Sequence, residues 1–288
     1  MYCLEKMYNI YKNDGMYRLE LFINLQEQLT KDPILRQYPL NFHERTQHVL
    51  NSESSLLQKR LLKVEQFSVE NLLKINESKS KIIIFNSSKN YVFPPEYSFS
   101  NGEILEVVDS TCLLGVTISA NLRWEANTKN IQKKAMAKMW LLRRLKALNL
   151  EPQIILEFYL KEIRILAEHS VAVWNSGLTL LQIQTLERIQ KVALRIILGV
   201  EYISYENARN MFGLKTLKER RHDLCLKFAL KLVESKHCEK FFNMSQATRP
   251  TRQQKFFVES FSNTKRCYNA PHNYLTRLVN ENQYKSSL

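Results

Sequence analysis

The sequence predicts an α+β fold that is predominantly helical, in which a small antiparallel sheet at about residues 80–120 precedes a helical bundle. Helix is expected to dominate because only 6 of the 288 residues are glycine and because Lys, Leu and Glu are abundant. From Trp124 onward, apolar residues recur at spacings of three and four, the period of an amphipathic helix. Before that point, short β-branched runs alternate with turn residues, a pattern typical of strands.

The chain is expected to contain four segments. Residues 1–50 are irregular, residues 51–120 combine a helix with the small sheet, and residues 121–243 form the helical bundle. Residues 244–288 are a basic tail in which aromatic and turn residues are mixed and the helical period fades. We expect this tail to be extended and to pack against the rest of the chain only intermittently.

The second segment is expected to begin with a helix at Ser52–Lys74, whose apolar side consists of Leu56, Leu57, Leu61, Val64, Phe67 and Leu72. Three short strands are then predicted, at Lys79–Asn86, Ile104–Val108 and Leu113–Ser119. Asn101-Gly102 is a turn dipeptide. A small antiparallel sheet is the economical arrangement of these strands.

In the third segment the spacing of apolar residues predicts helices at 125–148, 152–170, 179–199, 204–212 and 215–234. The apolar stripe of the first helix consists of Ile131, Ala135, Met139, Leu142 and Leu145. Gly177 is expected to break the chain before the third helix, and Gly199 is expected to cap its C-terminus.

The formal net charge of +14 implies an acidic partner, with nucleic acid first and an anionic membrane surface second. No run of about 18 apolar residues is present, and the N-terminus lacks the apolar core of a signal peptide. We therefore expect an intracellular protein, in the nucleus or cytoplasm, that does not insert into a membrane. The 5 cysteines are scattered and odd in number, which argues against a disulfide framework.

Positive charge is concentrated on the first helix of the bundle, where seven basic residues and no acidic residue lie between Lys129 and Lys146. Lys and Arg on one helix can follow a phosphate backbone. The expected contacts to an RNA or DNA duplex are Lys129, Lys133, Lys134, Lys138, Arg143, Arg144, Arg220 and Arg221. Helical geometry places Lys134 and Lys138 on one face and Lys133 and Arg144 on another. The alternative for all of them is a solvated helix face.

Two other groups of residues have structural interpretations beside functional ones. We expect Trp140 and Trp174 in the core between helices; the alternative is that a nucleic-acid base stacks on one of them. His222 and Cys225, one helical turn apart, could share a zinc ion, and His237-Cys238 follow near the end of the same predicted helix. Cys225 falls on an apolar face, however, so a buried structural cysteine is favoured.

Several chemistries lack the residues that they need. Two-metal polymerase or nuclease chemistry needs neighbouring carboxylates, but none of the four aspartates (Asp14, Asp32, Asp109 and Asp223) has an acidic neighbour. Every glycine is isolated, which excludes a phosphate-binding loop and a dinucleotide fingerprint. No His-x-Asp pair for iron and no Gly-x-Ser-x-Gly elbow is present. We expect no catalytic residue, metal site, cofactor or small-molecule substrate.

Six pieces of the chain, between about Leu56 and Leu232, are together similar to a known family. They read LLKINESKSKIIIFN, LEVVDSTCLLGVTISANLRWEANTKNI, KMWLLRRLKAL, FYLKEIRILAEHSVAVWNSGLT, LERIQKVALRIILG and RRHDLCLKFALK. In order and spacing they resemble the C-terminal part of a non-LTR (LINE-type, jockey-like) retrotransposon reverse transcriptase. The resemblance implies that 1–50 is a palm remnant, 51–120 the palm edge, and 121–243 a thumb-like domain that grips a template–primer duplex.

The chain departs from this family where catalysis is concerned. The family carries an aromatic-x-Asp-Asp strand turn where this chain reads Gly15, Met16, Tyr17 and Arg18. The fingers and most of the palm have no counterpart in it. The resemblance therefore implies a catalytically inactive remnant that at most binds nucleic acid.

A second resemblance covers only about Leu114–Tyr159. This span is similar to a short segment associated with the N-terminus of AlkB-homologue tRNA-modifying enzymes, which would imply dioxygenase or methyltransferase activity. The iron and S-adenosylmethionine sites of such enzymes are absent from the sequence. A third possibility is a protein–protein interaction module whose basic helix docks on an acidic protein.

Overall fold

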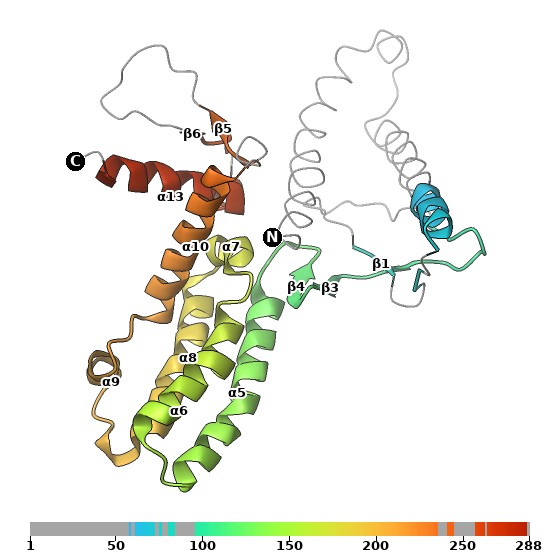
Figure 1. Ribbon diagram of the computed structural model, residues 1–288. Coiled ribbons are helices and arrows are strands. Elements are labelled where there is room, and N and C mark those ends of the chain that lie inside the picture. Colours follow the sequence, from blue (N-terminus) through green and yellow to red (C-terminus); the bar gives the residue numbers. More distant parts are fainter. Residues whose placement is uncertain are drawn as a thin grey trace. The chain divides into compact units, whose positions relative to one another are not determined.

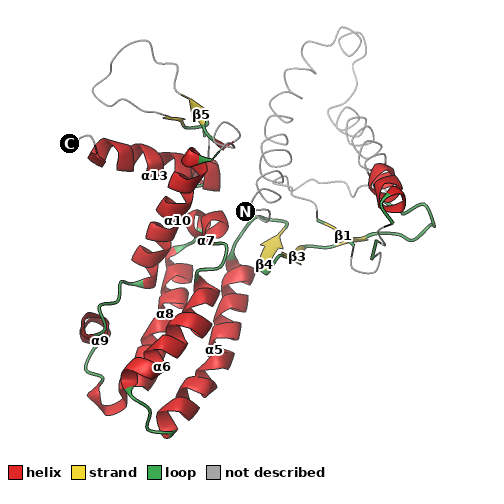
Figure 2. Cartoon of the chain, viewed as in Figure 1, coloured by secondary structure: helices red, strands yellow, loops and turns green. Residues whose placement is uncertain are grey.

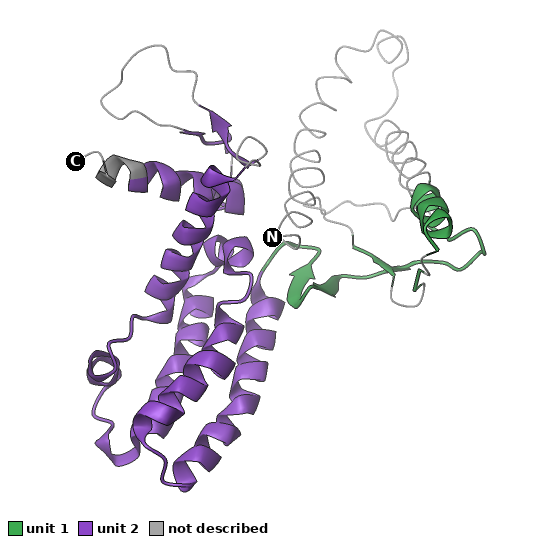
Figure 3. Cartoon of the chain, viewed as in Figure 1, with its two compact units in different colours: residues 1–123 green, residues 124–288 purple. Residues whose placement is uncertain are grey.

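A computed structural model describes residues 58, 61–72, 75–76, 80–83, 96–235, 241–244, 257–262 and 264–286. The chain divides into two units, residues 1–123 and 124–288 (Figure 3). Long helices and two-stranded sheets make up the described residues, which confirms a predominantly helical α+β fold (Figure 2). The predicted segment 1–50, together with Leu56 and Leu57 of the predicted helix, lies outside the described residues.

In the first unit a helix at residues 61–70 covers a small apolar core. Leu61, Ile75 and Ile82 pack there against the buried side chains of Tyr97, Phe99 and Leu105. Polar side chains fasten the helix to the neighbouring loop. Gln58 Nε2 donates to the carbonyl of Ser98 at 2.7 Å, and Glu65 Oε1 accepts from the backbone N–H of Ser100 at 2.9 Å.

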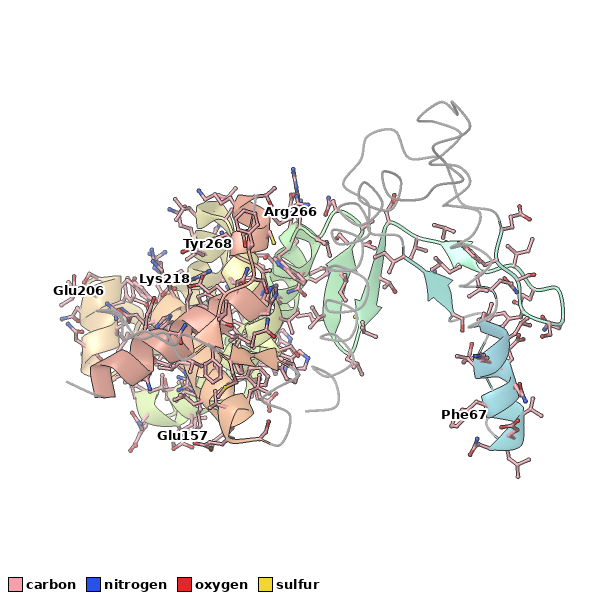
Figure 4. All side chains as sticks on the ribbon, turned by 90° about the horizontal axis from the view of Figure 1, so that it is seen from above. Phe67, Glu157, Glu206, Lys218, Arg266 and Tyr268 are labelled. Atoms are coloured by element: carbon pink, nitrogen blue, oxygen red, sulfur yellow. The ribbon has the colours of Figure 1, made fainter. Side chains whose placement is uncertain are left out.

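The expected apolar side of this helix is mostly wrong. Val64, Phe67 and Leu72 are exposed, whereas Ser68 is buried. Figure 4 labels Phe67, a residue that is 58% exposed. The hydrogen bonds of Gln58 and Glu65 explain the difference, because they turn the 58–65–68 face toward the loop and rotate the predicted face away.

In the first unit the strands form two separate pairs, one antiparallel as expected and one parallel, and not a single sheet. β1 (Lys81–Ile82) pairs in parallel with β2 (Glu106–Val107), and an ion pair of 2.7 Å joins Lys81 Nζ to Glu106 Oε2 across the register. The connection between the two strands is long enough for the chain to return in the same direction. The Asn101-Gly102 turn is confirmed: Ser98 and Ile104 form an antiparallel bridge around it.

The second pair is a hairpin in which β3 (Ser110–Leu113) is antiparallel to β4 (Val116–Ser119). The sequence had suggested a single strand at Leu113–Ser119, but the chain reverses at Leu114 and Gly115. Both turn residues have positive φ, 51° and 87°, as a two-residue hairpin turn of type I′ requires. Glycine adopts this conformation without steric strain, which makes the reversal feasible here.

The second unit is a helical bundle (Figure 1). Its main helices are α5 (Glu125–Ala147), α6 (Pro152–Phe158), α8 (Leu180–Leu198), α9 (Tyr205–Met211) and α10 (Leu217–Glu234). They begin and end close to the predicted bounds, except at the end of α6. α5, α6 and α8 contact one another and bury side chains that include Ile131, Met139, Leu142, Ile155, Leu186, Ile189 and Ile197.

The predicted helix 152–170 is not uniform. After α6 the chain winds as a π-helical turn at Tyr159–Ile163 and then as a 3₁₀ turn at Arg164–Ala167. Ser170, with a left-handed φ of 50°, ends this helical stretch. A short helix α7 (Val171–Trp174) and a 3₁₀ turn (Asn175–Gly177) follow.

The two glycines flanking α8 lie where the sequence predicts breaks. A Cβ on Gly177 would lie 2.6 Å from Trp124 Nε1, so only glycine fits against this ring. Gly199 caps the C-terminus of α8 with a φ of 61°, as expected.

The expectation of an extended tail is wrong for residues 265–286. β5 (Asn243–Met244) pairs with β6 (Phe257–Val258), and α12 (Lys265–Tyr268) leads into α13 (Pro271–Ser286). α13 packs against α10 and α7. It buries Leu275, Leu278 and Val279, a helical spacing that basic and aromatic neighbours obscure in the sequence.

Candidate nucleic-acid interface

α5 is held in the bundle by one face, and this fixes the direction of the other. Ile131, Ala135, Met139 and Leu142 are buried at spacings of three and four, where α5 contacts α6 and α8. Since side chains at such spacings share one side of a helix, the residues between them face outward. The bundle therefore supplies a rigid support for the outer face of α5.

The outer face is basic. Lys129, Lys133, Lys134, Arg143 and Arg144 are exposed. Lys129 Nζ forms an ion pair of 2.7 Å with Glu125, one turn earlier on the helix. In the part of the chain that the structure describes, Lys133, Lys134, Arg143 and Arg144 form no ion pair. These four cations are available to a negatively charged partner.

Lys138 lies at the edge of this face and is half-buried. Its Nζ contacts the Glu162 carboxylate at 2.8 Å and the Glu162 carbonyl oxygen at 3.0 Å. Lys134 and Lys138 were expected to share one helix face. Of the two, Lys138 forms an ion pair, and among the described residues Lys134 does not. Lys138 joins α5 to the π-helical turn.

Arg220 lies elsewhere in the bundle and is engaged by an acid. Its Nε contacts Glu168 Oε1 at 3.1 Å, and Arg164 contacts the same oxygen at 3.1 Å. Because Glu168 is largely buried, this cluster connects α10 to the 3₁₀ turn before α7. The expected phosphate contact at Arg220 would have to compete with this ion pair.

Arg221 is not a surface residue, which corrects both interpretations suggested by its sequence. Its side chain is fully buried, and its Nε donates to Asn175 Oδ1 at 3.1 Å. Among the described residues, Nη1 and Nη2 have no hydrogen-bond partner. Burial lowers the pKa of Arg221, while Glu187 opposes this effect. Arg221 occupies the same stripe of α10 as Leu217, Cys225, Ala229 and Leu232, which are all buried.

Trp174 is in the core as expected, but Trp140 is not. Trp174 is 0% exposed and donates from Nε1 to the carbonyl of His169 at 3.0 Å. Trp124 is 4% exposed, whereas Trp140 is 56% exposed. Trp140 directly follows the buried Met139, and one residue turns an α-helix by about 100°. The ring is therefore carried onto the outer face of α5.

A second basic helix face was not singled out from the sequence. Arg188, Lys191 and Arg195 are exposed on α8 at spacings of three and four. Lys191 Nζ lies 5.2 Å from the centre of the Tyr205 ring, and Arg195 lies 5.1 Å from that of Tyr202. The sequence contains a signal for this face. On the side of the helix opposite its apolar stripe, basic residues recur with the same helical period.

The described residues contain no group of three or more His, Cys, Asp and Glu side chains placed to hold a metal ion. Cys225 is buried as expected, and burial raises the pKa of its thiol to about 12. His222 Nδ1 lies 3.2 Å from the Tyr274 hydroxyl. His237 and Cys238 lie outside the described residues.

Within the described part of the chain, the helices are too short or too polar to cross a membrane. Comparison with models of known protein families, with curated protein sequences and with solved structures finds no match to this chain.

Proposed function

We propose that this chain binds the phosphate backbone of nucleic acid through the outer face of α5, as a catalytically inactive relative of non-LTR reverse transcriptases. The observation that carries the proposal is the set of four exposed basic residues (Lys133, Lys134, Arg143 and Arg144) without an ion pair among the described residues. The helix has no acidic residue after Glu125. Nothing on its own surface therefore neutralises this charge.

Nucleic acid is the partner that best fits such a face. A duplex presents closely spaced phosphates along each strand, and neutralising them with Lys or Arg releases condensed counterions. A rigid helix with cations spread along its length can follow that line of charge without being ordered first. The net charge of +14 adds a long-range attraction to the same kind of partner.

Catalysis by this chain alone is not part of the proposal. Nucleotide transfer needs two metal ions held by neighbouring carboxylates, and no aspartate in the chain has an acidic neighbour. We expect the purified chain to bind a primer–template duplex without extending the primer.

The test is a salt titration of binding to a fluorescently labelled RNA–DNA duplex, followed by anisotropy. The double variant Lys133→Gln/Arg144→Gln removes two exposed cations from α5. The matched control, Lys227→Gln/Lys231→Gln, removes two exposed cations from α10. The plot of log K against log salt has a slope that falls by roughly 0.9 for each lost phosphate contact, so the α5 variant should lose about 1.8.

The control variant should keep the slope of the parent chain. Absence of binding at low salt would overturn the proposal. Equal slopes for the α5 variant and the control would also overturn the proposal. Binding would then depend on the total charge of the chain and not on the outer face of α5.

A further inference from the structure

Trp140 is an exposed indole on the basic helix. All three tryptophans lie among the described residues, and two of them are buried; Trp140 is 56% exposed. An indole buries a large apolar area when it is covered, so its exposure is unfavourable unless a partner covers it. The surroundings of the ring show which partner fits.

The ring lies within a row of cations. Lys129, Lys133, Trp140 and Arg144 are exposed, and spacings of four, seven and four place them on one side of α5. Ala137, one turn before Trp140, is also exposed and carries only a methyl group. Side chains on a helix lean toward its N-terminus, so we expect the indole to lie over this small residue, and 56% of Trp140 is exposed.

An open indole between cations has the chemistry of a base-stacking site. Every nucleobase has a π-face that can stack on an aromatic ring, while Lys and Arg hold the phosphates on either side. Lys133 and Arg144 are separated by about 16 Å along the helix axis, at 1.5 Å per residue. This length accommodates a few nucleotides, with one base over Trp140.

We propose that the outer face of α5 binds single-stranded nucleic acid, with an unpaired base stacked on Trp140 between Lys133 and Arg144. Paired bases inside a duplex are stacked on each other and do not offer a face to the indole. A single strand offers one at every nucleotide. This inference rests on the proposed phosphate binding by the same helix and adds the bases as a second point of recognition.

The buried state of the other two tryptophans makes the test specific. Titration with a short oligothymidylate should quench the intrinsic tryptophan fluorescence, since stacking brings a base onto Trp140, whereas Trp124 and Trp174 are covered by protein. An abasic oligonucleotide of the same length keeps the phosphates and lacks the bases. It should bind by salt-dependent contacts without this quenching.

Variants separate stacking from phosphate contact. Trp140→Ala should weaken oligothymidylate binding about 10- to 100-fold and leave abasic binding unchanged. Trp140→Phe, which keeps a smaller ring, should lose less. Leu148→Ala changes another exposed apolar residue, next to the end of α5, and should have no effect. Circular dichroism checks that each variant keeps its helical fold.

The outcomes distinguish the two proposals. Equal affinity of the parent chain and Trp140→Ala for oligothymidylate would overturn the stacking site while leaving phosphate binding in place. Failure of both the abasic and the normal oligonucleotide to bind would overturn both. Loss of abasic binding in Trp140→Ala would also contradict base stacking, because that ligand has no base to lose.

Discussion

The hydroxyl of Tyr159 donates a hydrogen bond of 3.0 Å to Oε1 of Gln190 inside the helical bundle. Gln190 Nε2 donates in turn to the Tyr205 hydroxyl and to the carbonyl of Lys215, both at 3.0 Å. Burial raises the pKa of both tyrosines, and for Tyr205 a hydrogen bond to Glu187 adds to the effect. The hydroxyls therefore remain protonated donors, and this network joins α8 to the π-helical turn, to α9 and to the start of α10.

Gln190→Leu should destabilise the bundle by about 2–4 kcal/mol, because it leaves the buried Tyr159 hydroxyl without its acceptor and removes two further hydrogen bonds. Tyr159→Phe removes only the hydroxyl that donates to Gln190, so it should lower the free energy of unfolding by about 1–2 kcal/mol. Urea unfolding measures both. In the double variant the two losses should not add, since the residues are in contact; full additivity would contradict the network.

The Glu187 carboxylate accepts hydrogen bonds from the backbone N–H groups of Leu217 and Lys218, at 3.1 and 3.2 Å. It therefore caps the N-terminus of α10. Glu187→Ala should lower the free energy of unfolding by about 2 kcal/mol. The control is Glu157→Ala on α6, whose exposed carboxylate (Figure 4) forms an ion pair with the exposed Lys161. That variant should unfold like the parent chain. Similar losses in both would show that Glu187 is no cap.

Arg221→Met should leave stability unchanged or raise it, because a buried cation with two unpartnered nitrogens is replaced by an apolar side chain of similar length. Arg221→Ala should be less stable than the Met variant by about 2 kcal/mol, since it leaves a cavity. Neither should change the salt dependence of nucleic-acid binding. A smaller slope in Arg221→Met would place this residue at the phosphate backbone after all.

Stability should fall as the pH drops below about 6.5, partly because of His272. Burial, with a contribution from Arg277, lowers the pKa of His272 in the folded chain. The unfolded chain therefore takes up the proton first, and the stabilisation, complete above the ordinary histidine pKa of about 6.5, is lost toward the lower folded pKa. His272→Gln should flatten the dependence of the free energy of urea unfolding on pH between about pH 7 and pH 5. An unchanged pH dependence in this variant would exclude His272 as a source.

The helices of the bundle are predictable because their signal is local. The stripe of Ile131, Ala135, Met139 and Leu142 fixes the orientation of α5 by its period alone. The starts of α8 and α10 also have a local signal: Thr179 with Gln182, and Thr216 with Glu219, form capping boxes, and the pattern of Thr followed three residues later by Gln or Glu could have been recognised.

The predictions from sequence fail where contacts between residues distant in the chain determine the structure. The parallel pairing of Lys81 with Glu106 depends on the path of the chain between them, which no short pattern contains. In the candidate site, the same periodicity that located the core also predicts the burial of Arg221 and the exposure of Trp140. Residue type argued the other way in both cases, because an arginine is usually outside and a tryptophan inside.

The docking of α13 on α7 has a consequence for how the protein is made. During translation α7 leaves the ribosome long before α13, and α7 is a short helix in which all four residues, Val171 to Trp174, are buried in the finished fold. Until α13 has been synthesised, part of this apolar surface has no cover. We therefore expect this part of the bundle to close only after α13 has been synthesised.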